Sequence, residues 1–224
     1  GTLKDENDMA AENFVAEQDA PFFAKMYKES GIRGGHIILL NPLASAYYPQ
    51  TKGQALDALR EYPGGLQVGG GITPENSLEF LQAGASHVIV TSYVFRDGKV
   101  SMQNLERMAE TVGKEHLVLD LSCRKRDGNY YIVTDRWQKF TEVTISRNVL
   151  RELAFFCDEF LVHAVDVEGK ASGIETGLVS LLAEGSEIPT TYAGGVGTFE
   201  DLKTLAELGK GRLDVTIGSA LDLF

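Results

Sequence analysis

The sequence has few cysteines and no long apolar run. Its only cysteines, Cys123 and Cys157, lie outside any CxxC pair. Two such thiols do not make a disulfide framework, so we expect both to be reduced and partly buried. No apolar run reaches the roughly 18 residues that a membrane-spanning helix needs. A membrane protein is therefore not expected.

Basic residues are also scarce relative to acidic ones. The chain has 21 Lys and Arg against 32 Asp and Glu, a net charge of -11. Nucleic-acid binding needs patches of Lys and Arg, so this balance argues against a DNA or RNA partner. An anionic ligand must then be held by local groups rather than by the overall field. A hydrophobic content of 43% over 224 residues allows one sizeable domain, and we interpret 1–224 as a single domain.

Short apolar runs alternate with helical patterns along the chain. Each run is nearly continuous in apolar character, which is typical of strands buried on both faces of a parallel sheet. The expected strands are 36–40, 65–68, 87–90, 117–120, 160–164, 189–193 and 213–217. Expected helices include 20–30, 75–83, 101–112 and 199–208. This alternation predicts an all-parallel α/β fold.

An internal repeat distinguishes a barrel from an open sheet. Segments 66–78 and 191–202 both run from a strand through a glycine turn into a helix. Gly70 and Gly195 are 125 residues apart, and Ser92 and Ser219 are 127 apart. A period of this size predicts a (β/α)8 barrel made of two half-barrels, approximately 1–114 and 115–224. Only seven strands are found, so we expect the first strand to precede residue 1. The family resemblance described below implies in addition that a last helix follows residue 224.

Four small turns mark the carboxyl ends of the repeated strands, where barrel enzymes carry their active sites. They are Gly69-Gly70-Gly71, Thr91-Ser92, Gly194-Gly195 and Gly218-Ser219. Glycine permits close backbone approach, and a turn that leads into a helix presents free amides to a phosphate. A single such turn is often an ordinary tight connection, but the duplicated pair predicts a substrate with two phosphates. Gly195→Val is expected chiefly to raise KM.

Polar side chains at two strand ends are candidates for catalysis. Asp120 ends an apolar strand, where a carboxylate is costly unless it is paired or functional, and it is a candidate general acid or base. Ser122 points to the same side, either assisting Asp120 or simply bonding to it. His163, expected directly across from Asp120, is either catalytic or a satisfied core residue. Asp166 lies nearby, and Trp137, in the long loop after Asp120, either stacks on a heterocycle or plugs the loop.

These motifs together resemble one family over essentially the whole chain, the eukaryotic HisA-type phosphoribosylformimino-5-aminoimidazole carboxamide ribotide (ProFAR) isomerases. The resemblance rests on the following runs: Leu66-Gln67-Val68-Gly69-Gly70-Gly71-Ile72, Asp120-Leu121-Ser122-Cys123-Arg124-Lys125, Trp137-Gln138-Lys139, His163-Ala164-Val165-Asp166-Val167-Glu168-Gly169, and Asp214-Val215-Thr216-Ile217-Gly218-Ser219. The resemblance implies histidine biosynthesis, an Amadori rearrangement of an aminoaldose to an aminoketose, and no metal or cofactor. It also implies two catalytic carboxylates, of which one matches Asp120 and the other belongs to the expected first strand.

The same resemblance suggests the remaining roles. Asp120, His163 and Ser122 are the expected catalytic residues. The expected substrate-binding or phosphate-binding residues are Gly70, Gly71, Thr91, Ser92, Trp137, Asp166, Gly194, Gly195, Gly218 and Ser219. We expect a monomer acting on a small bisphosphate in the cytoplasm, or in the plastid stroma if the source is a plant or alga. Two alternatives stay open: a HisF-type cyclase, which shares the repeat but needs a glutaminase partner, and a non-catalytic bisphosphate-binding barrel.

Overall fold

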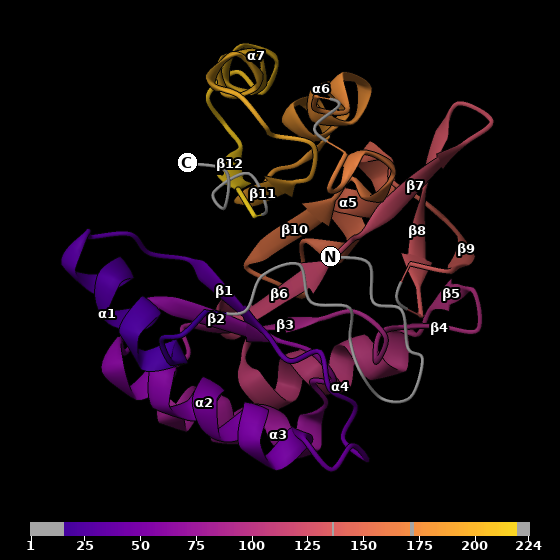
Figure 1. Cartoon of the computed structure of the whole chain (residues 1–224). Coiled ribbons are helices and arrows are strands. Elements are labelled where there is room, and N and C mark those ends of the chain that lie inside the picture. The colour runs from indigo at the N-terminus through magenta and orange to yellow at the C-terminus, as the bar shows by residue number, and fades with distance from the viewer. Residues whose placement is uncertain (1–15, 136, 171–172, 219–224) are drawn as a thin grey trace. The chain divides into compact units, whose positions relative to one another are not determined.

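The fold is taken from a computed structural model that describes residues 16–135, 137–170 and 173–218 (Figure 1). Ser219, one of the predicted site residues, lies outside these ranges. The chain divides into two compact units, one ending at Ile89 and the other beginning at Val90.

The first unit is built from parallel strands, each followed by a helix. Its strands are β1 (Gly35–Ile38), β2 (Leu66–Gly69) and β3 (His87–Val90), paired in that order. Its helices are α1 (Ala20–Glu29), α2 (Tyr48–Glu61) and α3 (Pro74–Ala83), and α2 packs on both others. The fully buried side chains of Leu59, Val68, Phe80 and Val88 form the core between helices and strands.

The second unit continues the same pattern. Its parallel strands, in spatial order, are β6 (Leu117–Asp120), β10 (Glu159–His163), β11 (Thr190–Ala193) and β12 (Asp214–Thr216). Its helices are α4 (Met102–Val112), α5 (Arg147–Leu153), α6 (Thr176–Gly185) and α7 (Phe199–Leu208). Two short 3-10 helices, η1 (Lys114–His116) and η2 (Val165–Val167), precede β6 and follow β10. The seven predicted strands are thus confirmed to within two residues.

Strands that are apolar on both faces must be buried on both faces, and the side chains of the parallel strands are buried accordingly. Leu117, Val118 and Leu119 of β6 are fully buried, as are Phe160 and Val162 of β10. The two cysteines also lie in this core as free thiols. Burial raises the pKa of Cys157 to about 12 and that of Cys123 further still, so both thiols are held in the neutral form. No helix in the described ranges is long and apolar enough to span a bilayer.

The internal repeat is visible in the strand register. Gly69 pairs with Ile89 in the first unit, and Ala193 pairs with Thr216 in the second. The amide of Leu39 donates to Gly69 just as that of Ala164 donates to Ala193. The strand ends Gly69 and Ala193 are therefore equivalent, which matches Gly70 with Gly194 and Gly71 with Gly195. The predicted match of Gly70 with Gly195 was wrong by one residue.

The cause of that shift is one extra residue in the second turn. Both copies end on a threonine N-cap with a capping box, at Thr73 and at Thr198. A single residue separates Gly71 from Thr73, whereas two separate Gly195 from Thr198. The helix caps are thus 125 residues apart, while the glycines are 124 apart. A single spacing applied to both the glycines and the caps does not reveal the inserted residue.

The segment after Asp120 is more ordered than the loop that we predicted. It folds as a three-stranded antiparallel sheet of β7 (Cys123–Arg126), β8 (Asn129–Thr134) and β9 (Lys139–Thr144). A separate two-stranded hairpin pairs β4 (Phe95–Arg96) with β5 (Lys99–Val100). Figure 1 shows β7, β8 and β9 projecting beyond the end of β6. The sheet therefore extends from the carboxyl ends of the parallel strands, where the site was predicted.

Candidate functional site

Asp120 is the carboxylate at the carboxyl end of β6, and it is held by three hydrogen bonds. Its Oδ1 accepts from the backbone amide of Ser122 at 2.8 Å and from the Ser122 hydroxyl at 2.7 Å. Its Oδ2 accepts from the hydroxyl of Thr91 at 2.9 Å. Asp120 is only partly buried, so a ligand can reach it, while these bonds fix the plane of the carboxylate.

Ser122 is buried, with 1% of its surface exposed. Its carbonyl accepts from the amide of Val133 on β8, and its hydroxyl and amide both bond to Asp120. Of the two roles considered from the sequence, this geometry favours a hydrogen-bonding neighbour. Ser122 joins the start of the antiparallel sheet to the predicted catalytic carboxylate.

His163 does not lie directly across from Asp120, as the sequence predicted. Leu161, and not His163, is in register with Asp120, so His163 lies two residues further toward the carboxyl end of β10. Its Nε2 lies 3.0 Å from Glu168 Oε2, and the two side chains form an ion pair when the imidazole is protonated. Contact with His163 lowers the pKa of Glu168, and burial opposes this only partly. Glu168 was not among the predicted site residues.

Trp137 lies in the turn between β8 and β9, with a left-handed backbone φ of 68°. Its ring centroid is 4.8 Å from that of His163, at an interplanar angle of 54°. The indole is thus held against a site histidine rather than packed as an isolated hydrophobic plug. Because the indole is only partly buried, part of its surface stays open to solvent or a ligand.

Asp166, in η2, is engaged by the first strand of the antiparallel sheet. Its Oδ1 accepts from Arg124 Nε at 2.9 Å, and its Oδ2 accepts from the backbone amide of Lys125 at 2.7 Å. Its backbone carbonyl accepts from Lys170. The geometry therefore gives Asp166 a structural task, which is to hold β7 beside the end of β10.

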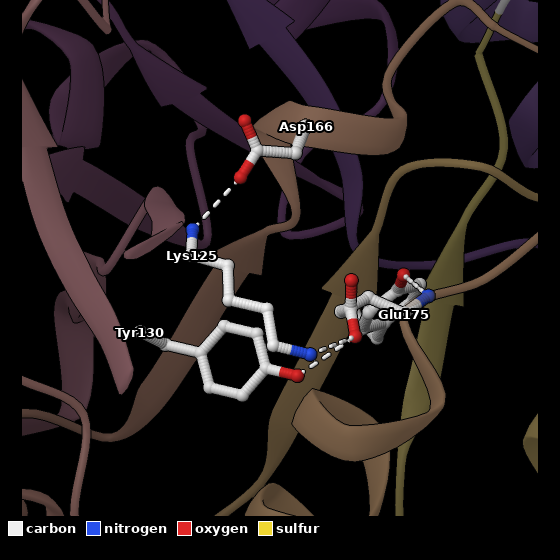
Figure 2. A network of polar contacts seen from close by, with 5 residues as sticks. Lys125, Tyr130, Asp166 and Glu175 are labelled. Atoms are coloured by element: carbon white, nitrogen blue, oxygen red, sulfur yellow. Dashed lines mark hydrogen bonds and ion pairs between the residues drawn. The ribbon is translucent and has the colours of Figure 1, made fainter. Parts of the chain in front are cut away.

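A second set of contacts ties the antiparallel sheet to the residue that precedes α6, Glu175 (Figure 2). Glu175 Oε1 accepts from Tyr130 Oη at 2.8 Å and pairs with Lys125 Nζ at 3.2 Å. The amide of Glu175 donates to Tyr192 Oη on β11. Burial raises the pKa of both tyrosines, and the bond to Glu175 raises that of Tyr130 further. We call Lys125, Tyr130, Glu175 and Tyr192 the Glu175 network. Lys125, Tyr130 and Glu175 line a small pocket together with Asp166.

The two glycines after β2 have different surroundings. Gly70 has a φ of 98°, and a Cβ there would lie 2.1 Å from the carbonyl oxygen of Leu39, so only glycine fits. Gly71 has a φ of 67°, is exposed, and a Cβ there would meet nothing within 4 Å. Open space in front of a turn that leads into α3 fits the predicted approach of a phosphate.

The equivalent glycines after β11 are buried. A Cβ on Gly194 would lie 2.7 Å from the Ala164 carbonyl oxygen, and one on Gly195 would lie 2.2 Å from that of Gly173. This turn is therefore packed against the segment that follows β10. Ser92, which follows β3, and Gly218, which follows β12, are both exposed. Within the described ranges, no group of three His, Cys, Asp or Glu side chains is arranged to hold a metal ion.

The contacts add residues that the sequence analysis missed. Arg124, Lys125, Tyr130, Glu168 and Glu175 all contact predicted site residues or connect their loops. The sequence indicated only weakly that Arg124 and Lys125 contact site residues. Adjacent residues of a strand point to opposite sides, so one of the two had to face the site. Glu175 carried none, since its role depends on a tyrosine 45 residues earlier in the chain.

Comparison with known families gives a match over almost the whole chain. Residues 6–222 match the family described as "Histidine biosynthesis protein". This match, together with the parallel βα units, confirms the predicted (β/α)8-barrel fold class.

Three curated relatives carry the same name, 1-(5-phosphoribosyl)-5-((5-phosphoribosylamino)methylideneamino)imidazole-4-carboxamide isomerase. A chloroplastic protein of Medicago truncatula is 53% identical over 95% of this chain and 66% of its own length. The Neurospora crassa protein is 42% identical over 100% of this chain and 86% of its own length. The Saccharomyces cerevisiae protein is 41% identical over 100% and 85%. The likeness extends across plant and fungal proteins.

Proposed function

The chain belongs to the histidine biosynthesis protein family, and on that premise we propose that it is a ProFAR isomerase. The relatives described above are named for this isomerisation. The reaction converts an aminoaldose into an aminoketose, so it moves protons without changing the substrate's composition. Such a reaction needs proton-transfer groups beside the reacting ribose, with no metal or cofactor.

The single observation that carries the proposal is the setting of Asp120. It is a partly buried carboxylate at the carboxyl end of a parallel strand, and hydrogen bonds to Ser122 and Thr91 fix both of its oxygens. A carboxylate that only stabilised the fold would not need a face open to solvent at this edge. We assign Asp120 the general-acid role, in which it protonates the ring oxygen of the ribose. A partner group then takes the proton from C2, and the two roles can be exchanged between them.

The turns and the indole account for substrate binding in this proposal. The turn formed by Gly70 and the exposed Gly71 receives a phosphate. Ser92, exposed after β3, is a further phosphate-binding residue. Gly194, Gly195, Gly218 and Ser219 receive the other phosphate. Trp137 covers the heterocycle beside His163. Asp166 contributes indirectly, by holding β7. We further propose that the protein acts as a monomer, in the plastid if its source is a plant or alga and otherwise in the cytoplasm.

The direct test is turnover of ProFAR by the full-length purified protein. The aminoketose product is identified by NMR and by a changed chromatographic retention at unchanged mass. Product formation without glutamine, ammonia or added metal is expected. Turnover that requires glutamine or ammonia would instead support the cyclase alternative. Tight binding of ProFAR with no product would support a non-catalytic bisphosphate-binding barrel and would contradict the proposal.

A further inference from the structure

We propose that the side chain of Thr91, which the sequence suggested only as part of a phosphate-binding turn, is a positioning residue for Asp120. The inference rests on the proposed function and deepens it. It starts from one contact, the 2.9 Å hydrogen bond from Thr91 Oγ1 to Asp120 Oδ2. A hydroxyl has one proton to donate, and here that proton goes to the carboxylate. The phosphate contact at this turn then falls to the exposed neighbour, Ser92.

The two oxygens of Asp120 have different kinds of partner. Oδ1 accepts from the backbone amide of Ser122 at 2.8 Å as well as from its hydroxyl. A backbone amide can only donate, so Oδ1 keeps these bonds only while it carries no proton. Oδ2 has the Thr91 hydroxyl as its partner, and a hydroxyl can either donate or accept. Oδ2 is therefore the oxygen that can gain and lose a proton while every bond to the carboxyl group is preserved.

The backbone of Thr91 is fixed independently of this contact. Its carbonyl accepts from the amides of Val94 at 3.0 Å and Phe95 at 2.9 Å, and both of those side chains are fully or almost fully buried. Threonine is also β-branched, which restricts χ1. The hydroxyl is thus presented to Oδ2 by a rigid turn. A bond that can reverse its direction at fixed oxygen positions suits a carboxyl group that cycles between its two protonation states.

The decisive comparison is between Thr91→Val, which removes the hydroxyl at nearly constant shape, and Thr91→Ser, which keeps it. Thr91→Val should lower kcat for ProFAR by about 10- to 100-fold, the usual effect of losing a hydrogen bond to a charged group. Its KM should stay within about twofold of wild type, and Thr91→Ser should recover most of kcat. Thr111→Val is the control, because the Thr111 hydroxyl bonds to the Arg107 carbonyl of its own helix.

Two results would overturn the inference. A Thr91→Val protein with wild-type kcat would do so, and so would one with a raised KM and unchanged kcat, which is the behaviour of a phosphate ligand. If Thr91→Val fails to fold, Thr91→Ala takes its place. In an Asp120→Asn background, Thr91→Val should lower kcat no further, since its effect passes through Asp120.

A measurement that needs no turnover separates this inference from the proposed function. The urea unfolding midpoints of wild type, Thr91→Val, Asp120→Asn and the double variant form a cycle. We expect the shift caused by Thr91→Val to be clearly smaller in the Asp120→Asn background. Additive shifts would contradict the contact, whereas absence of ProFAR turnover by wild type would contradict only the proposed function.

Discussion

Leu161 on β10 lies in register with Asp120 on β6, and this places His163 two residues beyond the carboxylate along the neighbouring strand. The parallel bridge between Cys123 and Ala164 continues the same register. His163 therefore contacts Glu168 and Trp137 instead of facing Asp120. The two residues that we predicted as a facing pair belong to separate clusters, and their variants should behave differently.

The Glu168 carboxylate should make a pH-dependent contribution to stability. Contact with His163 lowers its pKa from the ordinary 4.5, so the ionised form stabilises the fold above that value. The contribution is lost as the pH falls through the lowered pKa. Glu168→Gln should thus cost about 0.5–1 kcal/mol at pH 6, and the difference should shrink progressively as the pH falls below 4.5 toward the lowered pKa. Urea unfolding between pH 6 and pH 3 measures the difference.

The control for this measurement is Glu207→Gln, an exposed glutamate on α7. Its difference from wild type should stay small throughout the titration. A Glu168→Gln difference that is constant across the whole pH range would mean that packing, and not the charge contact with His163, gives Glu168 its effect.

Gly71 offers the cleanest test of phosphate approach. Gly71→Ala should raise KM by about tenfold, because a methyl group would occupy the open space before the turn. Gly31 is a matched control: its φ of 69° is close to the 67° of Gly71, and a Cβ there also meets nothing within 4 Å. Both variants should lose about 1–2 kcal/mol through the same backbone strain. A rise in KM for both, or for neither, would count against the phosphate role.

Gly195 is a poorer choice than the sequence suggested. A Cβ there would lie 2.2 Å from the Gly173 carbonyl oxygen and 2.9 Å from Val167 Cγ2. Gly195→Val would therefore displace the segment after β10 and reduce stability, besides any effect on KM. A rise in KM in that variant would not report on phosphate binding alone.

The Glu175 network should stabilise the contact between the antiparallel sheet and the segment before α6. Tyr130 is 6% exposed, and its hydroxyl donates to Glu175. A double-mutant cycle of Tyr130→Phe and Glu175→Gln should give a coupling of about 1–2 kcal/mol in the free energy of unfolding. Tyr131→Phe, at the next residue, is the control because its ring packs against Arg126 and Phe140 on the other face of the sheet. A coupling near zero would show that the bond adds nothing to stability.

Much of the fold could be predicted because its signals are local. Buried parallel strands are continuously apolar, and the strand from Leu117 to Asp120 was located to the residue. The threonine N-caps at Thr73 and Thr198 mark helix starts in the same way. The antiparallel sheet was missed because β7 is Cys-Arg-Lys-Arg, which lacks the alternation of a half-buried strand. Aromatic residues from β8 and β9 cover its arginines instead.

The candidate site was predicted less completely, because register and partners depend on tertiary contacts. Strand identity placed Asp120 and His163 on neighbouring strands, but a shift of two residues separated them. Thr91 was found by its turn, yet its hydroxyl bonds to a carboxylate 29 residues away, and nothing local to the turn shows this. Gly71 is the opposite case, since its proposed role in phosphate binding is inferred from the turn itself.

The most direct test of the account is kcat for ProFAR in the full-length Asp120→Asn protein, with folding checked separately. The substitution keeps size and much of the hydrogen bonding to Ser122 and Thr91 but removes proton transfer. General acid–base catalysis contributes roughly 10²- to 10⁴-fold, so kcat should fall by at least about 100-fold while KM changes little. A folded Asp120→Asn protein that retains about a third or more of the wild-type kcat would contradict the account and move the acid role toward His163.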